Sequence, residues 1–358
     1  MGIKIETPAG EDALQQFVLF HDRVYADRSA HWPAPLELYL SILGGGSPFA
    51  DGREIRPFWA LDGGEIVARA AAVIDRRYQR HWGEALGHVT MFEALPATEA
   101  AVTELMDAAA QWLASRGAVA ARAGFGLFDL PFAMDSYEAL PPSVLRQNPS
   151  FYHLLLKQAR FEVEQGWVDY KARVTPALTE RWQRAVDGAR RAGFAVTPLR
   201  EVSRSRRLRD FTATWAETFK AHWGFTAFSE EELGLLFAGF EPTGFLETSV
   251  LAYRGDEPVG MCLVVPDEPG HAVLAPGRRV EESERLNLLA IGVREAARGQ
   301  GVNYAIAAHG FLELVRRGAT WVSYTLVLDH NWPSRRTGEG LGGSLCANYL
   351  TYRRNFRR

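Results

Sequence analysis

The sequence predicts an α+β protein of two related domains, each with a mixed, mostly antiparallel twisted sheet flanked by helices. At 358 residues the chain exceeds the length that one hydrophobic core usually serves. Its hydrophobic fraction of 47% and charged fraction of 23% are typical of a globular protein. The same order of strands and helix also occurs twice, which indicates an internal repeat. We place the domains at residues 1–173 and 174–358.

The first half shows a hairpin, a strand, an amphipathic helix and a final strand. Asp62-Gly63-Gly64 is the turn chemistry of a hairpin, and apolar residues recur every three or four positions between Val102 and Leu113. Arg116-Gly117 is typical of a helix end. The predicted strands are Phe58–Leu61, Ile66–Ile74, Gly87–Leu95 and Ala118–Ala123.

The second half repeats this order after a predicted helix over Leu178–Ala192. Its repeated helix, Tyr304–Arg317, ends at a glycine, as the first-half helix does. The hairpin turn is Arg254–Glu257. The predicted strands are Ser249–Tyr253, Val259–Val265, Leu286–Val293 and Trp321–Leu328.

The halves differ in the connection from the third strand to the helix. Only the second half has a glycine-containing turn there, Arg298-Gly299-Gln300-Gly301-Val302-Asn303, whereas the first half uses Leu95-Pro96-Ala97-Thr98. From hairpin turn to helix-ending glycine, the second copy is longer by roughly nine residues. A glycine turn at a helix N-terminus offers unpaired backbone N–H groups that bind phosphates. The second half therefore carries the predicted anion site.

The segment from Val293 to Val302, with its flanking strand, helix and second strand, resembles the acyl-CoA-binding core of GNAT-type N-acetyltransferases. Arg298 and Gly301 fit the family's Arg/Gln-x-x-Gly-x-Gly/Ala loop, and Asn303 departs from it. The resemblance implies a tandem GNAT protein with a degenerate N-terminal copy. It also implies acetyl-CoA or another acyl-CoA as co-substrate, with pantetheine along Ile291 and Val293. The implied cofactor-binding residues are Ile291, Val293, Arg298, Gly299, Gln300, Gly301, Val302 and Asn303.

The resemblance also implies Asn331 after the next strand, and a tyrosine seven positions later that supplies the proton for the leaving thiolate. That later position is Gly338 here, so the usual proton donor is missing. Tyrosines on nearby strand-like segments are substitutes, and Glu284 or Glu295 is the candidate base. The catalytic candidates are therefore Asn331, Tyr349, Tyr352 and Glu284, with Tyr324 a further substitute.

The composition and the absence of certain motifs argue against a metal site, a membrane protein and a nucleic-acid-binding protein. No histidine pair stands four residues apart and no Cys-x-x-Cys occurs, so we expect no metal site. Cys262 and Cys346 lie in apolar runs and indicate buried thiols in a reducing compartment. With no signal-peptide pattern and no apolar stretch of roughly 18 residues, we expect a cytoplasmic protein without a membrane partner. The net charge of −3 argues against nucleic-acid binding despite local arginine clusters.

The function predicted from the resemblance is acyl-CoA-dependent N-acyl transfer, with acetyl-CoA as donor and a small amine or amino-acid-like molecule as acceptor. Aromatic residues of the first half, Phe58, Trp59, Phe92 and Phe125, are candidates for the lining of the acceptor cleft, although core positions are favoured for them. Two alternatives stay open. One is a tRNA-dependent aminoacyl or peptidyl transferase that uses its C-terminal arginines on phosphate. The other is a non-catalytic acyl-CoA-binding regulator, which the glycine at position 338 favours. The sequence leaves the oligomeric state open.

Overall fold

A computed structural model describes residues 2–356 and confirms the predicted α+β class. Within these residues the strands form a large sheet of nine strands, a four-stranded sheet and a two-stranded ribbon. The large sheet has the order β1-β3-β4-β5-β6-β15-β8-β14, with β7 paired to β15. The four-stranded sheet has the order β13-β11-β10-β9.

The first half contains every element that the sequence predicts. A hairpin of β3 and β4 leads to β5, which lies antiparallel to β4 and parallel to β6. Helix α4 buries the predicted apolar face, including Val102, Leu105 and Leu113, against this sheet. The bounds are β3 Arg53–Asp62, β4 Glu65–Asp75, β5 Leu86–Ala94, α4 Glu99–Ala114 and β6 Ala120–Ala123.

The second half repeats the arrangement, as predicted. The β10–β11 hairpin pairs with β13, α10 follows, and β14 ends the repeat. Helices α6 and α10 pack together on one face of the four-stranded sheet, and α7 and α8 cover the other. The bounds are α6 Pro176–Arg191, β10 Val250–Arg254, β11 Glu257–Pro266, β13 Asn287–Val293, α10 Val302–Arg316 and β14 Trp321–Leu328.

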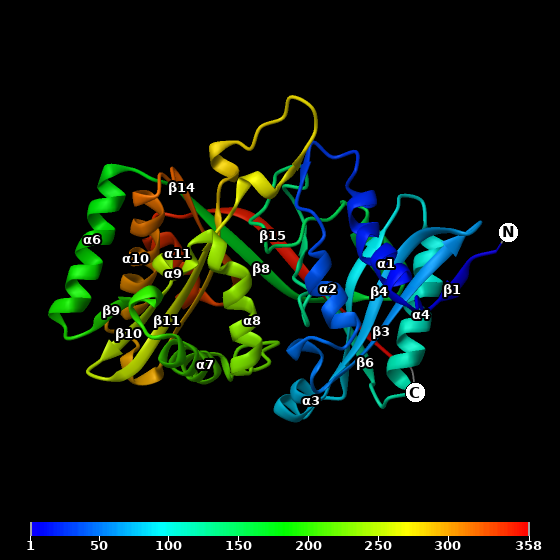
Figure 1. Ribbon diagram of the computed structural model, residues 1–358, viewed down its shortest axis with the longest axis horizontal. Helices are drawn as coiled ribbons and strands as arrows, with labels where there is room; N and C mark the ends of the chain where they lie inside the picture. The colour runs from blue at the N-terminus through cyan, green and yellow to red at the C-terminus, as the bar shows by residue number, and fades with distance from the viewer. Residues whose placement is uncertain (1, 357–358) are drawn as a thin grey trace.

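Two long strands join the halves (Figure 1). β8, Glu162–Arg173, ends the first half in sequence but pairs with β14 of the second. β15, Ser344–Asn355, is the last strand of the chain, and it pairs with β6 and β7 of the first half as well as with β8. The halves therefore exchange strands, and the division of the chain after residue 173 stays a prediction about folding units.

Further helices cover the sheets, among them α1 against β4 and β5, and α7 against β11 and β13. They are α1 Glu11–Val24, α2 Leu36–Leu43, α3 Arg76–Trp82, α5 Tyr152–Gln158, α7 Arg204–Phe219, α8 Glu230–Phe240, α9 Phe245–Thr248 and α11 Trp332–Gly340. The short strands are β1 Lys4–Glu6, β2 Ala30–His31, β7 Phe132–Ala133, β9 Ala195–Pro198 and β12 Val273–Leu274.

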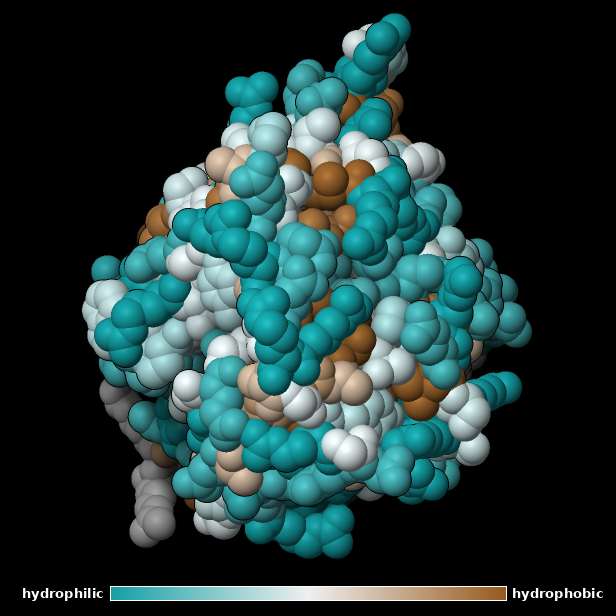
Figure 2. Space-filling model, turned by 90° about the vertical axis from the view of Figure 1, so that its left-hand side faces the viewer, coloured by the Kyte–Doolittle hydropathy of each residue, from teal (hydrophilic) through white to brown (hydrophobic). Residues whose placement is uncertain are grey.

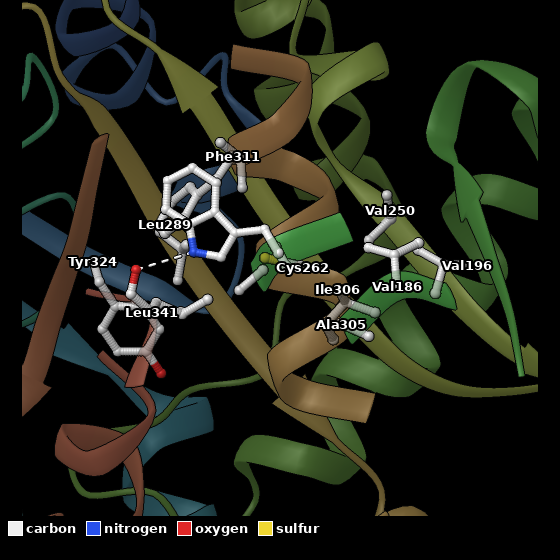
Figure 3. Close-up of a cluster of buried hydrophobic side chains, with 14 of the residues drawn as sticks. Val186, Val196, Val250, Cys262, Leu289, Ala305, Ile306, Phe311, Tyr324 and Leu341 are labelled. Carbon is white, nitrogen blue, oxygen red and sulfur yellow. Dashed lines mark hydrogen bonds between the residues drawn. The ribbon is translucent and has the colours of Figure 1, made fainter. Parts of the chain in front are cut away.

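The largest core of the second half lies between α6, α10 and the strands (Figure 3). Ala305 and Ile306 of α10 pack near Cys262, and Tyr324 lies beside Leu341. Cys262 and Cys346 are free thiols; Cys262 is buried as predicted, whereas Cys346 is only partly buried. The face seen in Figure 2 is mostly hydrophilic, with apolar side chains in small separate areas. Within residues 2–356, no helix is both long and apolar enough to cross a membrane.

Candidate functional site

The central feature of the second half is a gap between β13 and β14, which are edge strands of two different sheets. Side chains bridge them at one end only. Asn287 and Ser323 exchange hydrogen bonds of 2.9–3.1 Å, and Thr325 Oγ1 accepts from the Leu289 N–H at 2.9 Å. Because positions 287 and 289 face 323 and 325 in turn, the strands run parallel. Within the described residues no backbone ladder joins them, so the Ile291–Val293 edge is open.

The open edge leads to the glycine loop predicted from the sequence. Gly299 and Gly301 have φ of 74° and 78°, values that favour glycine, and Gly301 is the N-cap of α10. A β-carbon at either position would meet nothing within 4 Å. The backbone N–H groups from Gly299 to Tyr304 find no acceptor among residues 2–356. Convergent free donors at a helix N-terminus attract an anion.

Side chains of the loop stabilise its shape. The Arg298 Nε–H donates to the Val293 carbonyl at 3.1 Å, and Gln300 donates to the Ala296 carbonyl at 3.0 Å. Asn303 donates to Thr337 Oγ1 at 2.9 Å, which ties α10 to α11. Val302 is buried beneath the turn. Backbone N–H groups therefore remain as the donors for a ligand.

A cavity of about 360 Å³ adjoins the open edge. Its lining includes Ile291 and Asn331 at the edge and continues to Trp167 and Trp215. Of the four candidate aromatics, Phe125 lines this cavity. The other three have the core positions that were favoured for them: Phe58 and Phe92 belong to the first-half core, and Trp59 packs beside α1 and α2.

Among the described residues, Tyr324 is the one tyrosine that lines this cavity. It is buried on β14, lines the cavity together with Asn331 and Ser334, and its hydroxyl lies 2.9 Å from Ser334 Oγ. Burial raises the pKa of Tyr324, so its hydroxyl stays protonated. A β-carbon at Gly338 would approach the Tyr324 ring to 3.2 Å and the Tyr170 ring to 3.3 Å. The glycine thus leaves room for the ring of Tyr324 where the family has its own tyrosine.

Asn331 is the N-cap of α11, and its side-chain oxygen accepts from the Ser334 N–H at 3.3 Å. Its neighbour Asp329 accepts from Gln165. Asn331 shares the cavity with Ile291 and Tyr324, so the structure brings this predicted residue to the open edge.

Two other catalytic candidates, Glu284 and Tyr349, line a separate polar pocket of about 190 Å³. Arg278 forms two hydrogen bonds of 2.6 Å with Glu284. Burial opposes ionisation of Glu284, but Arg278 and the backbone N–H groups of Glu281 and Leu140 together outweigh it and lower the pKa. Tyr349 donates to buried Asp169 at 3.0 Å, and burial raises the pKa of Asp169 to about 7. No local sequence pattern distinguishes Asp169, which lies in the middle of β8.

The last candidate, Tyr352, lies in the first-half core, and its hydroxyl is 2.6 Å from His153 Nδ1. Catalytic roles for Glu284, Tyr349 and Tyr352 stay predictions, and the structure places none of the three at the β13–β14 edge. Glu295 is exposed in the loop.

The arginines at the C-terminus are engaged within the protein. Arg353 pairs with Glu84 at 2.6 Å, and Arg354 pairs with Asp107. Arg357 and Arg358 lie outside the described residues. Residues 2–356 contain no group of three His, Cys, Asp or Glu side chains placed to hold a metal ion.

Comparison with solved structures shows the fold. A tandem GNAT protein from the clavulanic acid biosynthesis pathway superposes with a TM-score of 0.60 at 9% identity, covering 99% of this chain and 98% of the other. A GCN5-related N-acetyltransferase from Sphaerobacter thermophilus gives 0.56 at 15% identity, over 99% and 96%. The glucosamine N-acetyltransferase region of a fungal multi-domain β-N-acetylglucosaminidase gives 0.58 at 16% identity, over 98% of this chain and 38% of that one. The chain therefore has the tandem GNAT fold.

The sequence comparisons are sparser. No protein-family model matches the chain. A bacterial ceramide synthase from Caulobacter vibrioides is 26% identical over 236 residues, which cover 64% of this chain. The chain thus spans 60% of the length of that relative.

Proposed function

We propose that the protein is an acyl-CoA-dependent N-acyltransferase whose donor site lies in the second half. The observation that supports this most directly is the open β13 edge, which ends at a loop with free backbone donors. A pyrophosphate needs several convergent donors, and the N–H groups from Gly299 onward provide them. The pantetheine amides would pair with the unpaired backbone near Ile291 and Val293.

Amide formation requires the amine nitrogen to attack the thioester carbonyl carbon, so that the N–C bond forms as the C–S bond breaks. The leaving thiolate then takes a proton, and the attacking ammonium must lose one to a base or to water. We assign the proton donor to Tyr324, because it lines the cavity and its protonated hydroxyl lies beside Ser334. Its position on β14 compensates for the glycine at 338.

The GNAT resemblance makes acetyl-CoA the simplest donor and a small amine or amino-acid-like molecule the simplest acceptor. The distant relative supports the reaction type independently. A ceramide is the amide of a fatty acid with a long-chain amino alcohol, so a ceramide synthase also forms an N-acyl bond.

Calorimetric titration with acetyl-CoA tests the donor site. In Gly301→Trp, a large side chain would fill the open space before α10, and we expect binding to weaken at least about 100-fold through loss of the backbone hydrogen bonds. Ala97→Trp is the matched control, since Ala97 is exposed in the corresponding first-half connection. It should leave the affinity unchanged.

Failure of the wild-type protein to bind any CoA thioester would contradict the proposal. A thiol-release assay over pools of amines then separates catalysis from regulation. Binding without release of CoA for any amine would favour the non-catalytic alternative. The tRNA-dependent alternative has less support, because Arg353 and Arg354 already pair with carboxylates of the protein.

A further inference from the structure

The cavity is much larger than an acetyl group requires. An engineered apolar cavity of about 150 Å³ holds a whole benzene molecule. The cavity beside the β13–β14 edge has about 360 Å³, more than twice that volume. A two-carbon acyl group would leave most of it empty, and unfilled space of this kind loses packing contacts.

Residues from both faces of the β13–β14 pair line the cavity. Leu289 and Tyr324 belong to the core on the α10 face of the second half, whereas Leu288 and Leu328 belong to the core on the α7 and α8 face. Hydrogen bonds to Ser323 and Thr325 close the gap at residues 287 and 289. A chain attached to a thioester in the gap would therefore pass at its open end, beside Ile291 and Leu328.

Beyond the gap, the cavity continues into the junction of the two halves. Its wall there is aromatic, with Trp215 and Phe219 of α7 on one side and Phe49 and Phe128 of the first half on the other. Phe125 stacks on Trp167, with ring centroids 4.9 Å apart. Helix α8 contributes Leu236, which packs against core clusters on both sides of the junction.

Two polar atoms in this wall lack a protein partner. The indole N–H groups of Trp167 and Trp215 are buried and find no acceptor among the described residues. Trp167 itself is 2% exposed. Because both N–H groups are shielded from the cavity, Trp167 and Trp215 present apolar surface to it.

From these observations we infer that the substrate of this site carries a long aliphatic chain, which passes through the β13–β14 gap and lies in the aromatic junction cavity. The inference rests on the proposed function and specifies its substrate class. The chain can belong to the acyl group of the donor or to the amine acceptor, because both meet at the gap. Each buried methylene improves binding by up to about fourfold, so chain length should be a strong determinant.

The test is a comparison of chain lengths on wild-type protein. One series uses acetyl-, octanoyl-, lauroyl- and palmitoyl-CoA with a fixed amine. The other uses ethanolamine and its long-chain 2-amino-alcohol homologues with a fixed donor, all below their micelle concentrations. A steep rise of kcat/KM in the donor series places the acyl chain in the cavity, and a steep rise in the acceptor series places the amine chain there. No dependence in either series overturns the inference.

Leu236→Trp locates the chain. The larger side chain would occupy the space of roughly three methylenes, and we expect a loss of about 60-fold in kcat/KM for the longest substrate with little change for the shortest. Leu235→Trp is the matched control, because Leu235 is its neighbour on α8, is 38% exposed and does not line the cavity. Urea unfolding of both variants verifies that they fold. Equal effects of the two substitutions would contradict the assignment.

Direct titration with laurate and dodecylamine, without CoA, separates this inference from the proposed function. Binding that Leu236→Trp weakens and Leu235→Trp does not would support the aliphatic site even if no CoA thioester binds. Binding of acetyl-CoA combined with no binding of either chain would overturn the inference and leave the proposed function in place.

Discussion

The two halves of the molecule have the same order of strands and helix, but they differ in whether one pair of parallel strands is joined by backbone hydrogen bonds. In the first half, β5 and β6 form a parallel backbone ladder from Leu86–Ala120 to Val89–Ala123. In the second half, the hydrogen bonds found between β13 and β14 in residues 2–356 all involve the side chains of Asn287, Ser323 or Thr325. A closed ladder uses its own N–H and C=O groups, whereas an open edge leaves them for a ligand.

The ends of the two third strands show the same contrast. Glu93 ends β5 in a buried network, in which its carboxylate accepts from Tyr152 at 2.7 Å and lies 2.9 Å from His21 Nδ1. Burial opposes ionisation of Glu93, but His21, Arg146 and Arg69 outweigh it and lower its pKa to about 2. In the second half, Val293 leads to the open glycine loop. The third strand of the first repeat is thus closed by a backbone ladder and a buried polar network, whereas the third strand of the second repeat has an open edge.

The largest effect should come from removing the buried carboxylate of Glu93 in the first half. Glu93→Gln would leave the positive charges of Arg69 and Arg146 under-compensated in a buried site, and we expect a loss of about 3 to 5 kcal/mol in the free energy of unfolding. Urea denaturation measures it. Glu295→Gln, in the exposed second-half loop, should change stability by less than about 0.5 kcal/mol. Similar losses of stability for Glu93→Gln and Glu295→Gln would contradict the contrast between a buried polar network at the end of β5 and an open loop after β13.

A smaller effect tests which half supplies the chemistry. Tyr324→Phe should lower kcat for acyl transfer about 100-fold, the usual contribution of a general acid, with little change in KM for the donor. Thioesters with more acidic leaving thiols should restore much of the rate, because their thiolates need no proton. A purely structural role would not show this rescue.

Tyr352→Phe is the counterpart, since Tyr352 lies in the first-half core and its hydroxyl meets His153. Its kcat should match that of the wild type. A large loss here, with Tyr324→Phe unaffected, would transfer the catalytic role to the candidate in the first half.

A pH-dependent effect concerns strand β8, which joins the halves. Asp169 on this strand has a raised pKa, so the folded protein holds its proton and loses the associated stability as the pH rises. The window runs from about 4, the ordinary aspartate value, to about 7. Asp169→Asn removes this titration, so its free energy of unfolding relative to wild type should rise by about 3 kcal/mol between the ends of that window.

Asp62→Asn serves as the control, because Asp62 is exposed at the first-half hairpin turn. Its stability difference from wild type should not vary with pH. If the difference in free energy of unfolding between Asp169→Asn and wild type also stayed constant with pH, β8 would not bury a protonated carboxyl group at this position.

Local signals predicted much of the fold and part of the site. The hairpin turns, the helix-ending glycines and the apolar periodicity of α4 and α10 act over a few residues, so they can be read directly. The glycine loop was predicted for the same reason. The capping box of Ser229 and Glu232, which begins α8, is a local signal of the same kind, although our sequence predictions did not include this helix.

The catalytic candidates show where this reading ends. Tyr324, Tyr349 and Tyr352 all lie on strand-like segments, and nothing local distinguishes them. Only packing places Tyr324 at the cavity, Tyr349 against Asp169 and Tyr352 against His153. The sequence alone therefore does not show which of Tyr324, Tyr349 and Tyr352 lies at the cavity.

The sequence by itself determined the repeat, the order of the elements and the one loop that can cradle a phosphate, because these depend on residues close together in the chain. The tertiary structure decided whether the third strand of each repeat is closed or open, and which strand crosses between the halves. It also decided that one cavity joins both faces of a sheet to the other half. Strand pairing and side-chain packing join residues far apart in the chain, and a local pattern specifies a strand without specifying its partner.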